Sequence, residues 1–478
     1  METVSARVSS VNDTKKCSLL LLLCFLAFNA TGLVSEASAE NIRDALARSY
    51  IVSPELNAQR ANTRAVDEVL PQAKGQWLPQ ATGQGNVGVL NQQLLSNTYS
   101  AFGFDGVDLK TITNPVGANL LVTMNIFNGF RGINGINQAE AQIHQARELL
   151  RNTEMAVLGQ AATAYMNLLR DTAVYEIQTD AVKVYEKQVS DTKEKLNSGE
   201  GTVTEVYQAE EYLAEARRQR VNAFNGVQAS IAAYKQIIQT VPSRLSPANP
   251  VDSLIPKKID EAIRDADAHH PLARAARYNV EISQYAVKLA EGQLAPTVNL
   301  QGRFGQQWNF FGTTGQRLYV GEGSVQVNVP IYEGGVYYSA IRQAKEKRSE
   351  AQLLFDRQIN KIHQEIETYW AQWQNASKYL TAARERVKSA EAALSGLREG
   401  LKYGQGTTWD VLNYQSRVYA ARIEFVTAQR DRVLSCYNLV FAIGSLSADT
   451  LGLDVPKYEV ADHYNRVKNQ FFGVEPWK

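Results

Sequence analysis

Histidine, cysteine and net charge are all scarce in this sequence. Its 478 residues include five histidines and three cysteines, which leaves little material for a metal site. Fifty Lys and Arg residues balance 49 Asp and Glu residues, so the formal net charge is only +1. Nucleic-acid-binding proteins need a basic surface, so this balance argues against that class. The sequence also contains no P-loop and no H-E-x-x-H motif, and we predict no enzymatic activity, cofactor or metal.

Long apolar runs are absent except near the N-terminus. There, three basic residues precede an apolar run at 18–28, and Ala37-Ser38-Ala39 fits the small-residue cleavage site of a signal peptide. The apolar run is shorter than the roughly 20 residues that a membrane-spanning helix needs. We therefore expect residues 1–39 to be a signal peptide, Glu40 to begin the mature chain, and Cys436 to be its one cysteine, buried in a helix.

Proline is absent from two long stretches, 132–197 and 335–402. Each stretch would form a helix roughly 100 Å long, and each is followed by a Gly-x-Gly-Thr turn and a returning helix, at 203–240 and 409–444. In the second stretch the apolar spacing alternates between 4 and 3, a heptad seam: Ile362, Ile366, Tyr369, Trp373, Ala376, Leu380, Ala383, Val387, Ala390, Leu394, Leu397 and Leu401. The pattern predicts two helical hairpins, and it fits a wide assembly or a solid structural coiled coil equally well.

Short motifs recur in the second half of the chain at constant offsets. Leu78-Pro79 and Ala295-Pro296 differ by 217 positions, and the Gly-x-Gly-Thr motifs at 199–202 and 404–407 differ by 205. The chain is therefore a tandem duplication, with a period too long for a solenoid repeat. The difference of 12 residues falls between positions 79 and 126, where we expect a longer loop in the first copy.

Four short segments between the helices, at 81–89, 117–127, 297–304 and 324–331, alternate polar and apolar residues as half-buried strands do. In an exported chain their apolar face can meet lipid. Aromatic residues near their ends resemble the girdles of membrane barrels: Trp77, Tyr99, Phe102, Phe104, Trp308, Phe310, Phe311 and Tyr319. Four strands cannot close a barrel, and lipid tolerates no open sheet edge, so several chains must combine.

Two copies of strand, strand, long helix, Gly-x-Gly-Thr turn and returning helix resemble the TolC family of outer-membrane channels. The most specific pieces are GQGTTWDVL at 404–412, the element Pro54-Glu55-Leu56, and Pro79, Pro296 and Pro330 at the strand-helix junctions. The tail HYNRVKNQFFG at 463–473 is similar to tails of members that serve type I secretion in alphaproteobacteria.

The resemblance implies a mainly α fold with membrane β-structure. Each protomer of a homotrimer would give four strands to a 12-stranded outer-membrane β-barrel and long helices to a periplasmic α-helical tube. The implied partners are a periplasmic adaptor, an inner-membrane transporter and outer-membrane lipid, with no nucleic acid. The implied division is 1–39 signal peptide, 40–76 first periplasmic helix, 77–131 first barrel hairpin, 132–240 first helical hairpin, 241–270 Pro-rich equatorial linker, 271–293 second periplasmic helix, 294–334 second barrel hairpin, 335–444 second helical hairpin and 445–478 C-terminal equatorial segment.

The resemblance also places the channel entrance at the helical turns. The repeat aligns Glu205 with Asp410 and Gln208 with Asn413. In the family the position of Asp410 lines the entrance, and a second Asp usually occupies the position held here by Asn413. Three copies of Asp410 would form a carboxylate ring that favours cations. The alternative interpretation of Asp410 is a carboxylate that stabilises a helix N-terminus.

Two further features of the turns follow from the resemblance. Tyr403 matches a family tyrosine that helps to latch the closed state, but the arginine usual after Gly-Thr is absent, and Thr408 and Trp409 stand there instead. The residues expected to contact the adaptor are those of the turns: Gly199, Gly201, Thr202, Gly404, Gly406 and Thr407.

We expect the chain to be the exit duct of a tripartite type I secretion or multidrug efflux system in the outer membrane of a Gram-negative bacterium. The alternative is a soluble periplasmic coiled-coil adaptor or scaffold, which would lack lipid-facing strands. Two segments, 241–256 and the tail from 445, are expected to form an irregular collar. We expect His269 and His270, which precede Pro271, to be a helix cap or surface residues rather than metal ligands.

Overall fold

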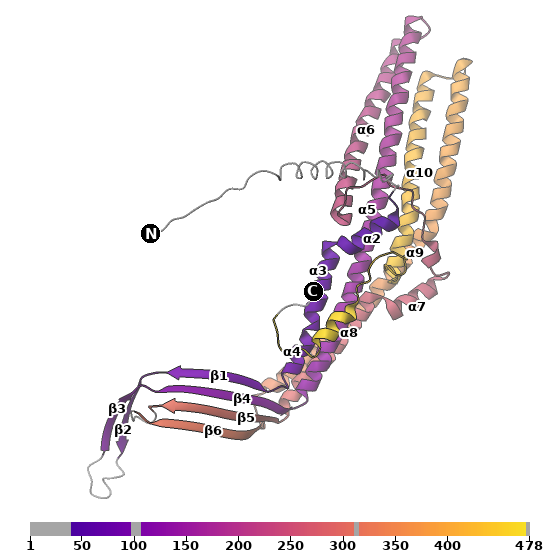
Figure 1. The fold of residues 1–478 in the computed structure, drawn as a ribbon. Coiled ribbons are helices and arrows are strands. Elements are labelled where there is room, and N and C mark those ends of the chain that lie inside the picture. The colour runs from indigo at the N-terminus through magenta and orange to yellow at the C-terminus, as the bar shows by residue number, and fades with distance from the viewer. Residues whose placement is uncertain (1–39, 97–106, 310–314, 475–478) are drawn as a thin grey trace, which may run out of the picture.

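The computed structural model describes residues 40–96, 107–309 and 315–474. The molecule is elongated, with a β-sheet at one end and the turns of two helical hairpins at the other (Figure 1). Short helices surround the middle. The predicted signal peptide and the aromatic residues at 99, 102, 104, 310 and 311 lie outside the described residues.

Four long helices form the body of the molecule. They are α5 (Arg131–Asn197) and α9 (Val336–Lys402), of 67 residues each, and α6 (Val203–Ile238) and α10 (Thr408–Ile443), of 36 residues each. The equal lengths reflect the duplication. Helix α5 packs against α6 and α10, and α9 packs against α10, so the two hairpins lie side by side (Figure 1).

No helix among the described residues combines the length and the apolarity that a membrane-crossing helix needs.

The sheet contains four antiparallel strands in the order β1-β4-β5-β6, namely β1 (Gln80–Val87), β4 (Val116–Asn128), β5 (Thr297–Trp308) and β6 (Arg317–Asn328). On one face, Leu300 lies between Met124 and Val325 in the register. On the other face, Gln301 donates a hydrogen bond to Gln326 at 3.1 Å. The strands therefore have the predicted apolar and polar faces, and β1 and β6 are open edges within the described chain.

The extra residues of the first copy form strands, so the prediction of a loop there was wrong. Strands β2 (Leu90–Ser96) and β3 (Val107–Thr113) pair in a separate two-stranded sheet that continues the β1/β4 register. Between the two ladders the amide of Gly88 donates to the carbonyl of Pro115 at 3.1 Å. Proline has no N–H to return this bond, which interrupts the ladder. The β2–β3 ribbon bends away from the sheet at this point (Figure 1).

The N-terminal region is three helices rather than the single helix expected over 40–76. They are α2 (Ile42–Val52), α3 (Pro54–Asp67) and α4 (Val69–Gly75). Pro54 cannot continue α2, because it lacks an N–H, but it is well suited to the first turn of α3. The Ser53 hydroxyl caps α3 by accepting from the Leu56 amide at 3.3 Å.

The equatorial segments are partly helical. Within 241–256 there is one 3₁₀ turn, η2 (Asp252–Leu254), followed by α7 (Ile259–His269), α8 (Pro271–Glu291) and a further 3₁₀ turn, η3 (Gly292–Leu294). The tail, predicted to be irregular, differs from that prediction at α11 (Val460–Val467), which is helical. The short α11 forms because its apolar face is covered: Tyr464 packs beside Leu70 and Ile143.

The largest core lies in the middle of the molecule, where the start of the described chain, the segment after α10 and both hairpins meet. Tyr165 of α5 and Tyr234 of α6 are fully buried there. Glu40, the first described residue, is buried too, and its amide donates to the carbonyl of Arg244 at 2.8 Å. The core residues shared by these elements include Ile42, Leu46, Leu158, Ile238, Val440 and Leu446. This core joins the linker to the helices.

His270 lies between α7 and α8 and is 2% exposed. Its Nδ1 accepts a hydrogen bond from the Leu272 amide at 3.2 Å, so it caps α8 as the sequence predicts. Burial, with a smaller contribution from the charge of Arg151, lowers the pKa of His270 to about 4. The imidazole is therefore neutral at neutral pH, which is the state that can accept this bond.

Candidate functional site

The two hairpin turns share one backbone design. Gly199 and Gly404, the first residues of the Gly-x-Gly-Thr motifs, have φ of 79° and 74°, the left-handed region that favours glycine. The amide of Glu200 then donates to the Lys195 carbonyl, and that of Gln405 to the Gly400 carbonyl, both at 2.9 Å. These bonds satisfy carbonyls at the ends of α5 and α9.

Each returning helix begins with a capping box. In the first turn the Glu205 amide donates to Thr202 Oγ1 at 3.3 Å, and the Thr202 amide donates to Glu205 Oε2 at 2.8 Å. In the second turn Thr407 and Asp410 make the same reciprocal bonds at 3.1 and 3.0 Å. Each box satisfies two amides that a helix N-terminus otherwise leaves without partners. Asp410 therefore has the helix-stabilising geometry, and its role in lining a pore stays a prediction.

Hydrogen bonds keep both acidic side chains ionised. Bonds from the Thr407 hydroxyl and amide lower the pKa of Asp410, and the Thr202 amide is the largest cause of the lowered pKa of Glu205. Both carboxylates are only partly covered, so each turn presents a negative charge to its surroundings at neutral pH.

A hydrogen bond links the two turns to each other. The Thr408 hydroxyl of the second hairpin donates to Glu205 Oε1 of the first at 3.0 Å. Thr408 is 5% exposed although it lies at the first position of α10. In the sequence, Thr408 stands out only as a departure from the family pattern. Its hydrogen-bond partner Glu205 lies 203 positions away, so no local spacing pairs the two residues. The sequence feature that could have indicated this hydrogen bond is a threonine directly beside the capping box, in place of the usual latch arginine.

The other predicted site residues are not joined to this link. Gln208 and Asn413, one helical turn further along, are half-buried on separate helices. Tyr403 is 78% exposed, and within the described chain its side chain makes no hydrogen bond. Pro79 and Pro296 directly precede β1 and β5, and Pro330 follows the end of β6 by two residues.

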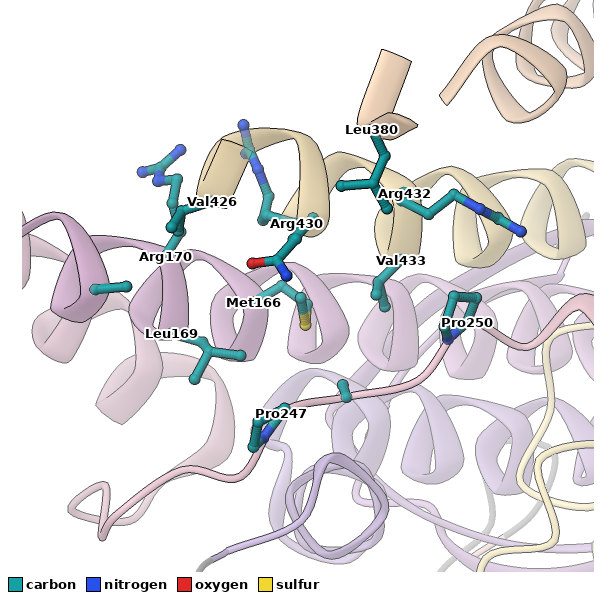
Figure 2. A pocket seen from close by; sticks show the side chains of 13 residues that line it. Met166, Leu169, Arg170, Pro247, Pro250, Leu380, Val426, Arg430, Arg432 and Val433 are labelled. Carbon is teal, nitrogen blue, oxygen red and sulfur yellow. The ribbon is translucent and has the colours of Figure 1, made fainter. Parts of the chain in front are cut away.

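A cavity of about 370 Å³ lies where the linker crosses α5 and α10. Figure 2 shows Met166, Leu169 and Val433 on its walls and Pro247 and Pro250 along the linker. Its three arginines already have carboxylate partners: Arg170 pairs with Asp171, Arg430 with Asp431 and Arg432 with Asp252. The cavity therefore has apolar walls and balanced charges, and it offers no convergent polar groups for chemistry.

The linker is fastened beside this cavity by Asp252. Its carboxylate accepts from Trp373 Nε1 of α9 at 2.8 Å and from Arg432 Nη2 of α10 at 2.5 Å. Cys436, buried as expected, also contacts it through Sγ at 3.4 Å. Over the residues that the structure describes, no three His, Cys, Asp or Glu side chains are placed to hold a metal ion.

A sheet with one apolar face, joined to long helices whose acidic turns lie at the far end, is the architecture expected of an outer-membrane channel protein. A family model described as "Outer membrane efflux protein" matches residues 42–238 and 262–445, and the chain belongs to this family.

Named relatives agree with this membership. The chain is 33% identical to the outer membrane efflux protein BepC of Brucella suis biovar 1 (strain 1330), over 96% of this chain and 97% of that protein. It is 22% identical to the outer membrane protein TolC of Escherichia coli (strain K12), over 90% of this chain and 87% of that protein. The alkaline protease secretion protein AprF of Pseudomonas aeruginosa is 22% identical, over 66% of each chain.

Solved structures share the fold. The CmeC outer membrane channel of Campylobacter jejuni has a TM-score of 0.75 and 14% identity, covering 98% of each chain. The outer membrane protein VceC of Vibrio cholerae has a TM-score of 0.70 and 17% identity, covering 84% of this chain and 96% of that one.

The predicted TolC-family membership, mixed helical and strand fold, outer-membrane location and export-channel function are confirmed. The soluble adaptor or scaffold alternative is not favoured.

Proposed function

We propose that three copies of the chain form the exit duct of a tripartite system. The sheets would join as a 12-stranded barrel in the outer membrane, and the hairpins would form the periplasmic tube. One observation carries the proposal: α5 and α9 each run 67 residues without a break from the end of a strand to a hairpin turn. A single protomer thus extends from the membrane to a point about 100 Å away.

The open sheet edges and the exposed apolar residues of α9 support the trimer. Strands β1 and β6 have no outer neighbour among the described strands, and lipid does not tolerate such edges. On α9 the apolar Leu353 and Tyr338 are exposed in the single chain. Neighbouring copies would cover both features. The segments at 241–270 and 445–458 would then form a belt around the middle of the tube, and the rest of the described tail would lie along α4 toward the sheet.

Electron microscopy of the detergent-purified protein tests this assembly. We expect a three-fold particle with a tube at one end and a detergent-bound barrel at the other. A monomer, or a particle that stays soluble without detergent, would contradict the proposal.

We propose that the hairpin turns are the periplasmic entrance and contact an adaptor that connects the duct to an inner-membrane transporter. Relatives named for efflux and for protease secretion support both types of cargo. The turns support this role because they lie at the end of the molecule opposite the sheet and carry two ionised carboxylates (Figure 1).

Replacing Asp410 by asparagine should reduce cation preference in planar bilayers. In a trimer the change removes three negative charges from one ring, which weakens the attraction for cations. Reversal potentials in a salt gradient measure this preference. Asp410→Glu keeps the charge and is the matched control. Equal selectivity in Asp410→Asn and the wild type would remove Asp410 from the pore lining and leave only its capping role.

A further inference from the structure

The C-terminal tail carries exposed apolar side chains. Phe472 and Val474 are 93% and 98% exposed, and Phe471 is half-exposed. Exposed apolar residues are common singly, but three within four positions, fixed at one place, mark an interaction surface.

Polar contacts fix the position of this tail. His463 Nδ1 of α11 lies 3.1 Å from Oδ2 of the buried Asp67 in α3. Lys74 of α4 donates from Nζ to the Lys468 carbonyl at 2.9 Å and to Asn469 Oδ1 at 3.1 Å. The backbone up to Asn469 is therefore held along α4, and Phe471 and Phe472 follow directly after this supported segment.

The described part of the tail ends beside the start of the sheet. Phe471, Phe472 and Val474 line one groove together with Leu78 and Pro79.

Pro79 also lines a second groove, on the sheet, with Val122, Met124 and Phe304. Side chains alternate along a strand, so Pro79 shares a face with Ala81 and Gly83. Their register partners Val122 and Leu120 belong to the apolar face. Pro79 thus connects the exposed tail to the apolar surface of the sheet.

We propose that residues 471–474 form an interfacial lipid anchor that inserts into the periplasmic leaflet of the outer membrane beside Pro79. The proposal rests on the sheet lying in that membrane, because the tail continues its apolar face. Phenylalanine side chains are among those that interfacial segments bury at the boundary between lipid headgroups and acyl chains. Lys74 and Lys468, next to the tail, suit the phosphate groups of lipids at that depth. Such an anchor would hold the tube at a fixed height below the membrane.

A spin label at position 472 tests the anchor. The processed full-length protein carrying Cys436→Ser and Phe472→Cys would be labelled with a nitroxide and reconstituted into phosphatidylethanolamine and phosphatidylglycerol vesicles. Electron paramagnetic resonance then compares its collisions with oxygen, which concentrates in lipid, and with a water-soluble nickel chelate. Phe472 is almost wholly exposed, so the substitution leaves the core intact. We expect oxygen collisions to dominate.

Two matched positions calibrate the result. Val327→Cys on the apolar face of β6 should give the lipid profile, and Gln326→Cys on its other face should give the aqueous profile. If collisions with the nickel chelate dominate at position 472, the labelled side chain lies in water and the anchor proposal is overturned. Exclusion of both reagents would overturn it in favour of contact with another copy of the chain. An aqueous profile at Val327 would instead contradict the membrane placement of the sheet.

Discussion

Replacement of Thr408 by valine is expected to raise the open probability of the reconstituted channel by about a hundredfold. Valine keeps the shape of threonine but removes the hydroxyl that donates to Glu205. A hydrogen bond contributes about 1 kcal/mol net, and solvent screening of the partly exposed Glu205 keeps this bond near that value although its acceptor is charged. If the bond exists only in the closed state, three such bonds in a trimer stabilise that state by about 3 kcal/mol when they act independently. Because 1.4 kcal/mol corresponds to a factor of ten, the equilibrium shifts by about two orders of magnitude.

Single-channel recordings in planar bilayers measure this effect. Thr408→Ser keeps the hydroxyl and should behave as the wild type. Glu205→Gln keeps an acceptor oxygen but not the charge, and should give an intermediate open probability. If Thr408→Val conducts like Thr408→Ser, the bond between Thr408 and Glu205 is not part of the closed state.

Acidification should destabilise the protein through His270. Its pKa in the folded chain is about 4, below the ordinary value of 6.5, because burial disfavours the charged form. Between these two values the unfolded chain binds more protons than the folded chain, so stability falls as the pH falls. The contribution of neutral His270 to stability is fully present above pH 6.5 and fully lost below about pH 4. The shift corresponds to about 3 kcal/mol.

The variant His270→Asn isolates this effect. Asparagine is a good helix N-cap and does not titrate between pH 4 and 7. Urea unfolding in detergent at a series of pH values measures the free energy of unfolding. Between pH 7 and pH 4 this free energy should fall by about 3 kcal/mol per protomer less in His270→Asn than in the wild type. Burial raises the pKa of Asp67 and Glu154, which gives the opposite pH dependence, but both groups are present in both proteins. Parallel pH profiles for the wild type and His270→Asn would contradict the assignment.

The long helices could be predicted closely because local signals bound them. Proline-free stretches end at left-handed glycines, and Thr202 and Thr407 open the returning helices within the predicted turns. The β2–β3 ribbon was missed because Gly88 and Pro115 interrupt the alternation at its base. Helix α11 was missed because its formation depends on packing against distant residues. The bond from Thr408 to Glu205 joins the two repeats in space, and no spacing along the chain encodes it.

Glu40 gives the molecule an order of assembly in time. Its amide bonds to the Arg244 carbonyl, and its own carbonyl accepts from the Ser246 amide at 3.0 Å and from the Tyr165 hydroxyl at 2.8 Å. Ser246 lies 206 positions further along the chain, in the linker between the two repeats. The central core therefore cannot close around Glu40 until the whole first repeat and this linker are present.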